Sequence, residues 1–143
     1  MSMEIHVLSN KELASVTAWQ RAIDSEGFNL KLDPEVKLES VSGFLPAILH
    51  GKQSGFECFH DEVSELVETY AETPALDFRR HWKYALSFRW GSLAHEGVSV
   101  FMAATAYAVA TDGIVFDPQE GRMLTLEECR EIARKWEREE FAA

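Results

Sequence analysis

Basic residues are scarce in this sequence. Its 14 Lys and Arg stand against 24 Asp and Glu, which gives a formal net charge of −10 at pH 7. Nucleic-acid binding is driven first by Lys and Arg side chains that neutralise phosphates, so this balance argues against a dedicated DNA or RNA binder. It also argues against docking on an anionic membrane surface, because such surfaces attract basic segments. An acidic chain is compatible with a basic protein partner, and equally with a simple role of charge in solubility.

Long apolar runs and closely spaced cysteines are missing as well. The longest uncharged apolar stretch, Val98–Ala110, is shorter than the roughly 20 residues that a helix needs to span a bilayer. The first residues contain neither the basic segment nor the apolar stretch of a signal peptide. The two cysteines, Cys58 and Cys129, lie far apart in the chain and are expected to be reduced, buried thiols. We therefore expect a cytoplasmic protein without a membrane span.

Motifs for metals, cofactors and covalent catalysis are also lacking. The chain contains no HExxH sequence, no Ser or Cys nucleophile elbow and no Gly-rich phosphate loop. The histidines show no pairing at metal-ligand spacing, such as i and i+4 on one helix. They are His6, His50, His60, His81 and His95. We expect neither a metal ion nor a cofactor.

The pattern of apolar residues predicts one α+β domain. Hydrophobic residues make up 46% of the chain and charged residues 27%, as in globular proteins, and no linker or repeat divides residues 1–143. Alternating segments, of which Tyr84–Trp90 is the clearest, predict strands, and segments with helical spacing lie between them. The order is β-α-β-β-β-α-β-α-β-β-α. The fold class is therefore α+β (mixed α/β), with packed helices on a mixed sheet and a right-handed βαβ unit around a buried helix at 92–111.

Short local patterns predict where helices begin and end. Ser9 followed by Glu12, and Thr125 followed by Glu128, are each typical of a capping box that opens a helix. Gly113 follows the apolar helical segment and fits the position just after a helix end.

The body of the helix at 92–111 is apolar on all sides. A helix with this pattern is buried on all sides, and its many Ala, Ser and Thr residues allow neighbouring elements to approach closely. The alternative is that the same surface forms a helix–helix contact in a homodimer.

The first turn of this helix carries His95 and Glu96. General acid–base groups are often found as such a pair at a helix N-terminus, and in an enzyme Asp112 and Asp117, which flank the next predicted strand, are expected to converge with them. Each of these residues also has a structural explanation. The helix dipole favours Glu96 at this position, where it can pair with Arg89, while Asp112 precedes a helix-ending glycine and Asp117 begins a turn.

Acidic residues gather between positions 57 and 72, where no Lys or Arg occurs. Like charges three or four residues apart destabilise a helix by about 0.2–0.5 kcal/mol per pair, so these acidic residues do not stabilise the helix that carries them. The spacing of Asp61, Glu65, Glu68 and Glu72 places them along one helical face. This face is solvated, binds a basic partner, or pairs with Arg79 and Arg80 folded back on it. The candidate partner-binding residues are Asp61, Glu62, Glu65, Glu68 and Glu72.

Two strings resemble those of small acidic bacterial proteins of uncharacterised function. They are Ala85-Leu-Ser-Phe-Arg-Trp-Gly91 and Thr111-Asp-Gly-Ile-Val-Phe-Asp-Pro-Gln-Glu-Gly-Arg122, and the segments 43–49 and 55–57 are similar as well. Some proteins of that type resemble immunity proteins, which neutralise polymorphic toxins or toxins delivered by type VI secretion. The resemblance implies a protein-binding function and brings no catalytic residue with it.

Together these features predict a cytoplasmic protein-binding domain, an immunity-type protein that occludes a basic toxin or effector through an acidic surface. One alternative is a small enzyme with an acid–base site at the N-terminus of the buried helix, which requires an open pocket there. Another alternative is a homodimeric structural protein.

Overall fold

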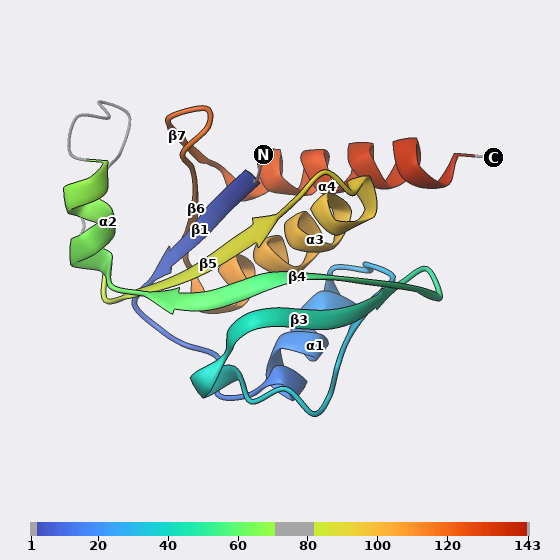
Figure 1. Cartoon of the computed structure of the whole chain (residues 1–143), viewed down its shortest axis with the longest axis horizontal. Coiled ribbons are helices and arrows are strands. Elements are labelled where there is room, and N and C mark those ends of the chain that lie inside the picture. Colours follow the sequence, from blue (N-terminus) through green and yellow to red (C-terminus); the bar gives the residue numbers. More distant parts are fainter. Residues whose placement is uncertain (1–2, 71–81, 143) are drawn as a thin grey trace.

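Seven strands form a single sheet, in the order β2-β3-β4-β5-β1-β6-β7. The computed structural model describes residues 3–70 and 82–142 (Figure 1). The strands are β1 (Met3–Ser9), β2 (Leu30–Leu32), β3 (Ser42–Leu49), β4 (Lys52–Asp61), β5 (Tyr84–Trp90), β6 (Ile114–Asp117) and β7 (Arg122–Leu124). The α-helices are α1 (Val16–Ser25), α2 (Val63–Thr69), α3 (Ala94–Thr111) and α4 (Leu126–Phe141), and a short 3-10 helix covers Leu38–Ser40.

The predicted α+β class is confirmed, and so is the strand–helix–strand unit around the long helix. The sheet differs from the expectation in one respect, since its described neighbours all pair antiparallel. β5 and β6 run parallel to each other, but β1 lies between them and pairs with both. The helix that connects them, α3, begins at Ala94 rather than at position 92.

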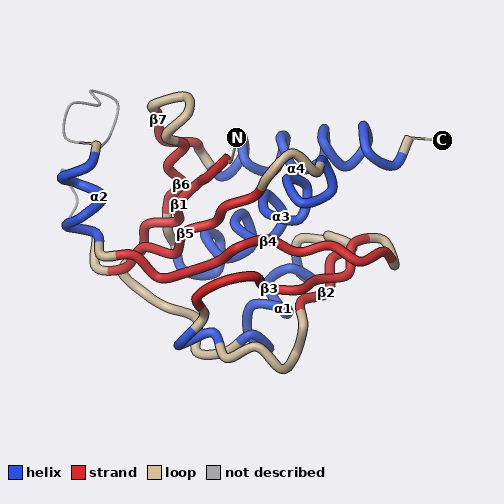
Figure 2. Tube along the Cα trace, in the orientation of Figure 1, coloured by secondary structure: helices blue, strands red, loops and turns tan. Residues whose placement is uncertain are grey.

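The two faces of the sheet are covered differently. On the inner face, residues such as Val7, Leu86 and Phe88 belong to the main core, and α1 and α3 lie behind the sheet in Figure 1. The alternate residues point to the outer face, where Leu8 and Ala85 pack against Leu66 of α2. Figure 2 shows the strands as one layer, with α2 standing apart from the other helices. The outer face is therefore covered by α2 at one end only, within the described chain.

Trp19 of α1 joins the helices to the sheet. Its ring meets Phe56, Phe88 and Tyr107 in edge-on contacts, with ring centroids 5.3–6.4 Å apart. The indole Nε1 donates to the carbonyl oxygen of Ala103 at 2.9 Å, which satisfies the polar atom of a fully buried side chain. These contacts fix α1 against α3 on the inner face.

The long helix α3 is buried along its body, as predicted. Its buried hydroxyls at Thr105 and Thr111 donate back to carbonyl oxygens one turn earlier, so they need no outside partner. Gly113 lies just after the C-cap of the helix, as expected, but the left-handed residue at this end is Asp112 (φ 54°). Gly113 has a different role, because a Cβ at this position would lie 2.6 Å from the carbonyl oxygen of Leu8. Glycine therefore allows the chain to pass close to β1 as it leaves the helix.

Of the two expected capping boxes, one is confirmed and one is wrong. Thr125 and Glu128 form a complete box at the start of α4. Ser9 does not cap a helix, because it is the last residue of β1 and pairs opposite Tyr84. The helix begins later, at Val16, and Ser15 is its cap. Pairing in the sheet thus outweighs a local helix signal at Ser9.

β3 and β4 form a hairpin with a two-residue turn at His50 and Gly51. Both residues have positive φ angles, 50° and 76°, which match the twist of the two strands and explain a glycine at the second position. The His50 ring stacks on Phe141 at a centroid distance of 3.9 Å, and its Nε2 lies 2.8 Å from Glu137 Oε2. The tip of the hairpin is therefore held against the C-terminal part of α4.

Candidate functional site

Three of the predicted acidic residues are exposed on or next to α2. They are Glu62, Glu65 and Glu68. None of the three forms an ion pair with another residue of the described ranges 3–70 and 82–142. Glu72 lies outside the described residues. Within the described chain, the charges of these three residues are thus not compensated by a cation. Arg79 and Arg80, which the sequence offered as partners, lie outside the described residues.

Asp61 does not belong to this surface, and the expectation that it lies along the helix face is wrong. It is the last residue of β4, and the cap position of α2 is Glu62, whose side chain makes no capping hydrogen bond. The Asp61 carboxylate accepts a hydrogen bond from the Ser87 hydroxyl at 2.6 Å and lies 4.0 Å from His6 Nδ1. Sheet pairing places Asp61 opposite Ala85, beside Ser87 on the same face. The side chain therefore points into a polar cluster below α2.

His6 completes this cluster, and its proton can be located by counting donors. The contact from Ser87 Oγ to Asp61 uses the single hydroxyl hydrogen of Ser87, because a carboxylate only accepts. The contact between His6 Nδ1 and Ser87 Oγ, at 2.7 Å, therefore needs its hydrogen from Nδ1. His6 Nε2 then carries a lone pair, and it is buried without a hydrogen-bond partner among the described residues. Burial, as the largest cause, lowers the pKa of His6, while Glu4 and Asp61 partly oppose this and Arg89 adds to it.

The remaining polar groups of this cluster pair with one another. The Tyr70 hydroxyl donates to Glu4 at 3.0 Å, and burial together with the charge of Glu4 raises the pKa of Tyr70 to about 12. Arg89 lies 3.5 Å from the same Glu4 and 5.2 Å from the centre of the Phe59 ring. Arg89 thus pairs with Glu4, not with Glu96 as one interpretation of the sequence suggested.

The structure separates the four residues of the predicted acid–base site. His95 and Glu96 lie in the first turn of α3, whereas Asp112 is its C-cap, roughly 25 Å away along the axis at 1.5 Å per residue. Asp117 lies on β6 and accepts hydrogen bonds from the N–H groups of the following turn. Burial raises the pKa of Asp117, and these hydrogen bonds oppose the shift. Both aspartates therefore have the structural roles that their turns suggested, and they do not converge with His95.

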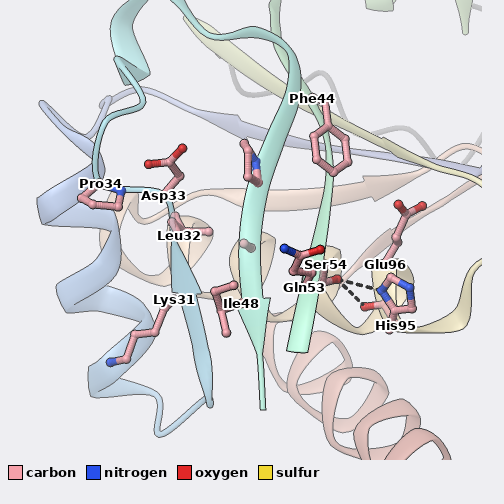
Figure 3. Close-up of a pocket in the computed structure, with 12 residues that line it drawn as sticks. Lys31, Leu32, Asp33, Pro34, Phe44, Ile48, Gln53, Ser54, His95 and Glu96 are labelled. Atoms are coloured by element: carbon pink, nitrogen blue, oxygen red, sulfur yellow. Dashed lines mark hydrogen bonds between the residues drawn. The ribbon is translucent and has the colours of Figure 1, made fainter. Parts of the chain in front are cut away.

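The first turn of α3 nevertheless borders an open groove on the outer face (Figure 3). The groove encloses about 670 Å³, and its apolar lining includes Phe44, Pro46 and Ile48 of β3. Phe44 is 57% exposed and Ile48 is 41% exposed. The opening that the enzyme interpretation required is present, but the groove extends away from Asp112 and Asp117.

The groove exists because β4 extends beyond the segment that pairs with β5. Only Glu57–Asp61 of β4 pair with β5, so residues 52–56 continue beyond the end of that strand. This part of β4 meets the start of α3 instead, through Ser54 and His95. At Gly55 a Cβ would lie 2.5 Å from Phe44 Cζ, so the glycine lets the Phe44 ring lie against the strand.

Ser54, Ser99 and His95 form a closed chain of hydrogen bonds beside the groove. The contacts are His95 Nδ1 to Ser54 Oγ at 2.9 Å, Ser54 Oγ to Ser99 Oγ at 2.8 Å, and Ser99 Oγ to the His95 carbonyl at 3.0 Å. Three hydrogens are needed, and the two hydroxyls supply two. The third must come from His95 Nδ1, which leaves Nε2 as an acceptor. In this arrangement Ser54 accepts from His95, so the histidine does not activate it as a nucleophile.

The charges around the groove are mostly negative. Lys31 lines it, but its ammonium group pairs with Asp24 at 3.1 Å. Asp33 accepts a backbone hydrogen bond from Glu35 at 3.0 Å, and neither Asp33 nor Glu96 has an ion-pair partner in the described chain. Two carboxylates therefore stand unpaired at the rim.

Sequence reasoning missed Phe44, Ile48 and Ser54 as site residues. A signal was present, since β3 is apolar at alternate positions on both faces: Leu45, Ala47 and Leu49 face the core, while Phe44, Pro46 and Ile48 face outward. Such a strand is expected to be covered on both sides. In the structure the outer side of β3 is exposed.

Comparison with known proteins places the chain in no group, since no protein-family model, no curated protein and no solved structure matches it. The described residues hold no cluster of three or more His, Cys, Asp or Glu that could bind a metal ion. No helix within residues 3–70 and 82–142 is long and apolar enough to cross a membrane. Any function must therefore be argued from the surface itself.

Proposed function

We propose that this chain is a cytoplasmic protein-binding domain of the immunity type, which occludes a basic toxin or effector through the outer face of its sheet. The observation that carries the proposal is the exposure of Glu62, Glu65 and Glu68 without ion-pair partners in the described chain. They lie on the same face of the sheet as the groove that exposes Phe44 and Ile48. An acidic patch on the same face as exposed apolar side chains is the composition expected of a surface for a basic partner.

Binding would proceed in two stages. The net charge of −10 steers a basic partner toward the protein and raises the association rate. A small number of apolar contacts then provides most of the affinity, because buried anchors contribute more than exposed ion pairs. Occlusion of the partner's working surface requires no chemistry from this chain.

The proposed binding residues are a subset of those expected from the sequence. Asp61 is withdrawn, because its carboxylate is engaged by Ser87 and lies near His6. Glu72 stays a prediction from the sequence. The core of the proposed acidic surface is thus Glu62, Glu65 and Glu68.

A charge-reversal experiment with a matched control tests the proposal. The triple variant Glu62→Lys, Glu65→Lys, Glu68→Lys changes α2, and the control variant Glu131→Lys, Glu139→Lys, Glu140→Lys makes the same charge change at exposed positions of α4. Wild type and both variants are used to capture partners from a lysate of the native host, and the captured protein is then purified. We expect a basic protein whose association with the α2 variant is at least tenfold slower at low salt. An acidic partner, or equal loss with the α4 control, contradicts the proposal.

An acid–base enzyme that uses His95 and Glu96, without Asp112 and Asp117, is a second candidate function. The observation that favours it is the open groove at His95 and Glu96, together with the unpartnered Nε2 acceptor of His95. A panel of chromogenic esters and phosphomonoesters tests this candidate with the wild-type chain and the His95→Gln variant. Hydrolysis that disappears in the variant would favour the enzyme, and no hydrolysis by the wild type would remove it for these substrates.

A further inference from the structure

We propose that the groove over β3 and β4 binds an extended segment of the partner in which apolar side chains alternate with Arg or Lys. This inference rests on the proposed function, and it names the kind of segment that would be held and the residues that would hold it. Phe44 and Ile48 contact the apolar side chains, and Asp33 and Glu96 contact the basic ones.

The floor of the groove is apolar and exposed. Phe44 and Ile48 are 57% and 41% exposed, on a strand whose other face is fully packed. Contiguous exposed apolar side chains on a soluble protein mark interaction sites, whereas single ones do not. Pro46 lies between them on the same face, so the exposed apolar positions are continuous along the strand.

The floor is also preformed. The Phe44 ring rests against Gly55, where no Cβ is present to displace it. The turn at the end of the hairpin is fixed by the stacking of His50 on Phe141. A surface that is already ordered loses little entropy when it binds, which favours its use as an anchor site.

Charge complementarity selects the flanking residues of the ligand. Asp33 and Glu96 are unpaired within the described chain, and in Figure 3 they stand on opposite sides of the strand that carries Phe44 and Ile48. The cation that lines the groove, Lys31, is already neutralised by Asp24. An acidic segment would meet two carboxylates here, whereas a basic one would meet acceptors on both sides.

His95 adds a third acceptor to this set. The hydrogen-bond chain through Ser54 and Ser99 holds the proton on Nδ1 and leaves the Nε2 lone pair free of partners among the described residues. An N–H donor, such as a guanidinium group, fits this position. The groove thus offers acceptors to a donor-rich ligand, around an apolar floor.

Synthetic peptides test the inference without the natural partner. The probe is a capped peptide of alternating Arg and Leu, and the two controls replace every Arg by Glu or every Leu by Ser. Binding to the full chain is measured by titration calorimetry and by amide shifts in ¹⁵N spectra. We expect saturable binding of the Arg–Leu peptide alone, with shifts that centre on Phe44, Ile48, Ser54 and Glu96. Absence of saturable binding, or equal binding of the Glu–Leu peptide, overturns the inference.

Matched variants locate the binding. Phe44→Ser is expected to weaken binding about tenfold and Glu96→Gln about threefold, the latter effect fading at high salt. The controls are Val109→Ser, which removes an apolar side chain 36% exposed on α3, and Glu131→Gln on α4. Both controls should leave binding unchanged, and so should the triple Lys variant of α2 once about 0.15 M salt screens its change in net charge. If Phe44→Ser has no effect, or if the α2 variant abolishes peptide binding, the groove is not the site.

Sedimentation of the free chain separates this inference from self-association. A monomer in both the wild type and the Phe44→Ser variant is expected. A dimer that dissociates in the variant would show that the groove binds a second copy, which overturns the inference. The peptide measurements use no cellular partner, so they stand or fall independently of the capture experiment that tests the proposed function.

Discussion

The Ser87 hydroxyl donates to the Asp61 carboxylate at 2.6 Å, across neighbouring strands of the outer face. This bond links Asp61 to His6, since Ser87 Oγ also accepts from His6 Nδ1 at 2.7 Å. The relay requires a hydrogen on Nδ1, the nitrogen of His6 that faces Ser87. Burial lowers the pKa of this histidine below the ordinary value of 6.5.

The protein should therefore lose stability in mild acid. Below pH 6.5 the unfolded chain binds a proton at His6 that the folded chain does not, so the free energy of unfolding decreases as the pH falls. The contribution is fully present above pH 6.5, and its slope below that value is at most about 1.4 kcal/mol per pH unit. Urea unfolding between pH 7.5 and pH 5 measures this slope.

The variant His6→Asn isolates the effect, because the Asn amide can still donate to Ser87 but does not titrate. We expect a shallower pH dependence in this variant than in the wild type. An identical slope in wild type and His6→Asn would show that His6 is not the responsible group.

Two glycines with different surroundings give a paired test of the packing near α3. A Cβ at Gly113 would lie 2.6 Å from the Leu8 carbonyl oxygen, whereas a Cβ at Gly91 would have no neighbour within 4 Å. Gly113→Ala should therefore destabilise the protein by about 1–3 kcal/mol, since either the helix end or β1 must move. Gly91→Ala should be neutral or stabilising by up to about 1 kcal/mol, because it restricts the unfolded chain. Thermal unfolding of both variants measures the difference, and equal stabilities would contradict the close approach.

The elements of this fold could be predicted because their signals are local. The alternation in 84–90 and the Thr125–Glu128 box depend on neighbours in sequence, and the structure confirms both. The role of Asp61 could not be predicted in this way. Its partners, Ser87 and His6, are distant in sequence and meet it only when β4, β5 and β1 assemble.

The groove depends on tertiary structure for a similar reason. Phe44, Pro46 and Ile48 show the pattern of a covered strand, and no local signal states that the described helices leave this half of the outer face open. The separation of His95 from Asp112 was, by contrast, implied by the length of the helix between them. The expectation that these residues converge was based on the positions of strand ends and ignored the length of the helix.

A side chain protects the edge of the sheet at β2. The Gln20 amide accepts from the Leu32 N–H at 2.8 Å and donates to the Leu30 carbonyl at 2.8 Å, as a neighbouring strand would. Gln20→Ala removes these two hydrogen bonds and a third, to Asp24 at 3.0 Å, so it should cost about 1–2 kcal/mol and open the edge to other chains. Urea unfolding measures the cost, and hydrogen exchange at the Leu32 amide should accelerate more than at other strand amides. Arg21→Ala, an exposed change on the same helix, is the control, and equal effects of the two variants would refute the protective role.

The chain of hydrogen bonds beside the groove predicts a specific tautomer of His95. Three contacts shorter than 3.1 Å require three hydrogens, and the hydroxyls of Ser54 and Ser99 supply two of them. A neutral His95 should therefore carry its hydrogen on Nδ1, although free histidine in water favours Nε2. Long-range ¹⁵N–¹H spectra of the imidazole distinguish the two forms directly. In Ser54→Ala the hydroxyl that accepts from His95 Nδ1 is absent, so the Nε2-protonated form should increase. Ser92→Ala, an exposed change before α3, should have no effect. A wild-type spectrum dominated by the Nε2-protonated form would remove His95 from the acceptors of the groove and leave Asp33 and Glu96 as its hydrogen-bonding rim.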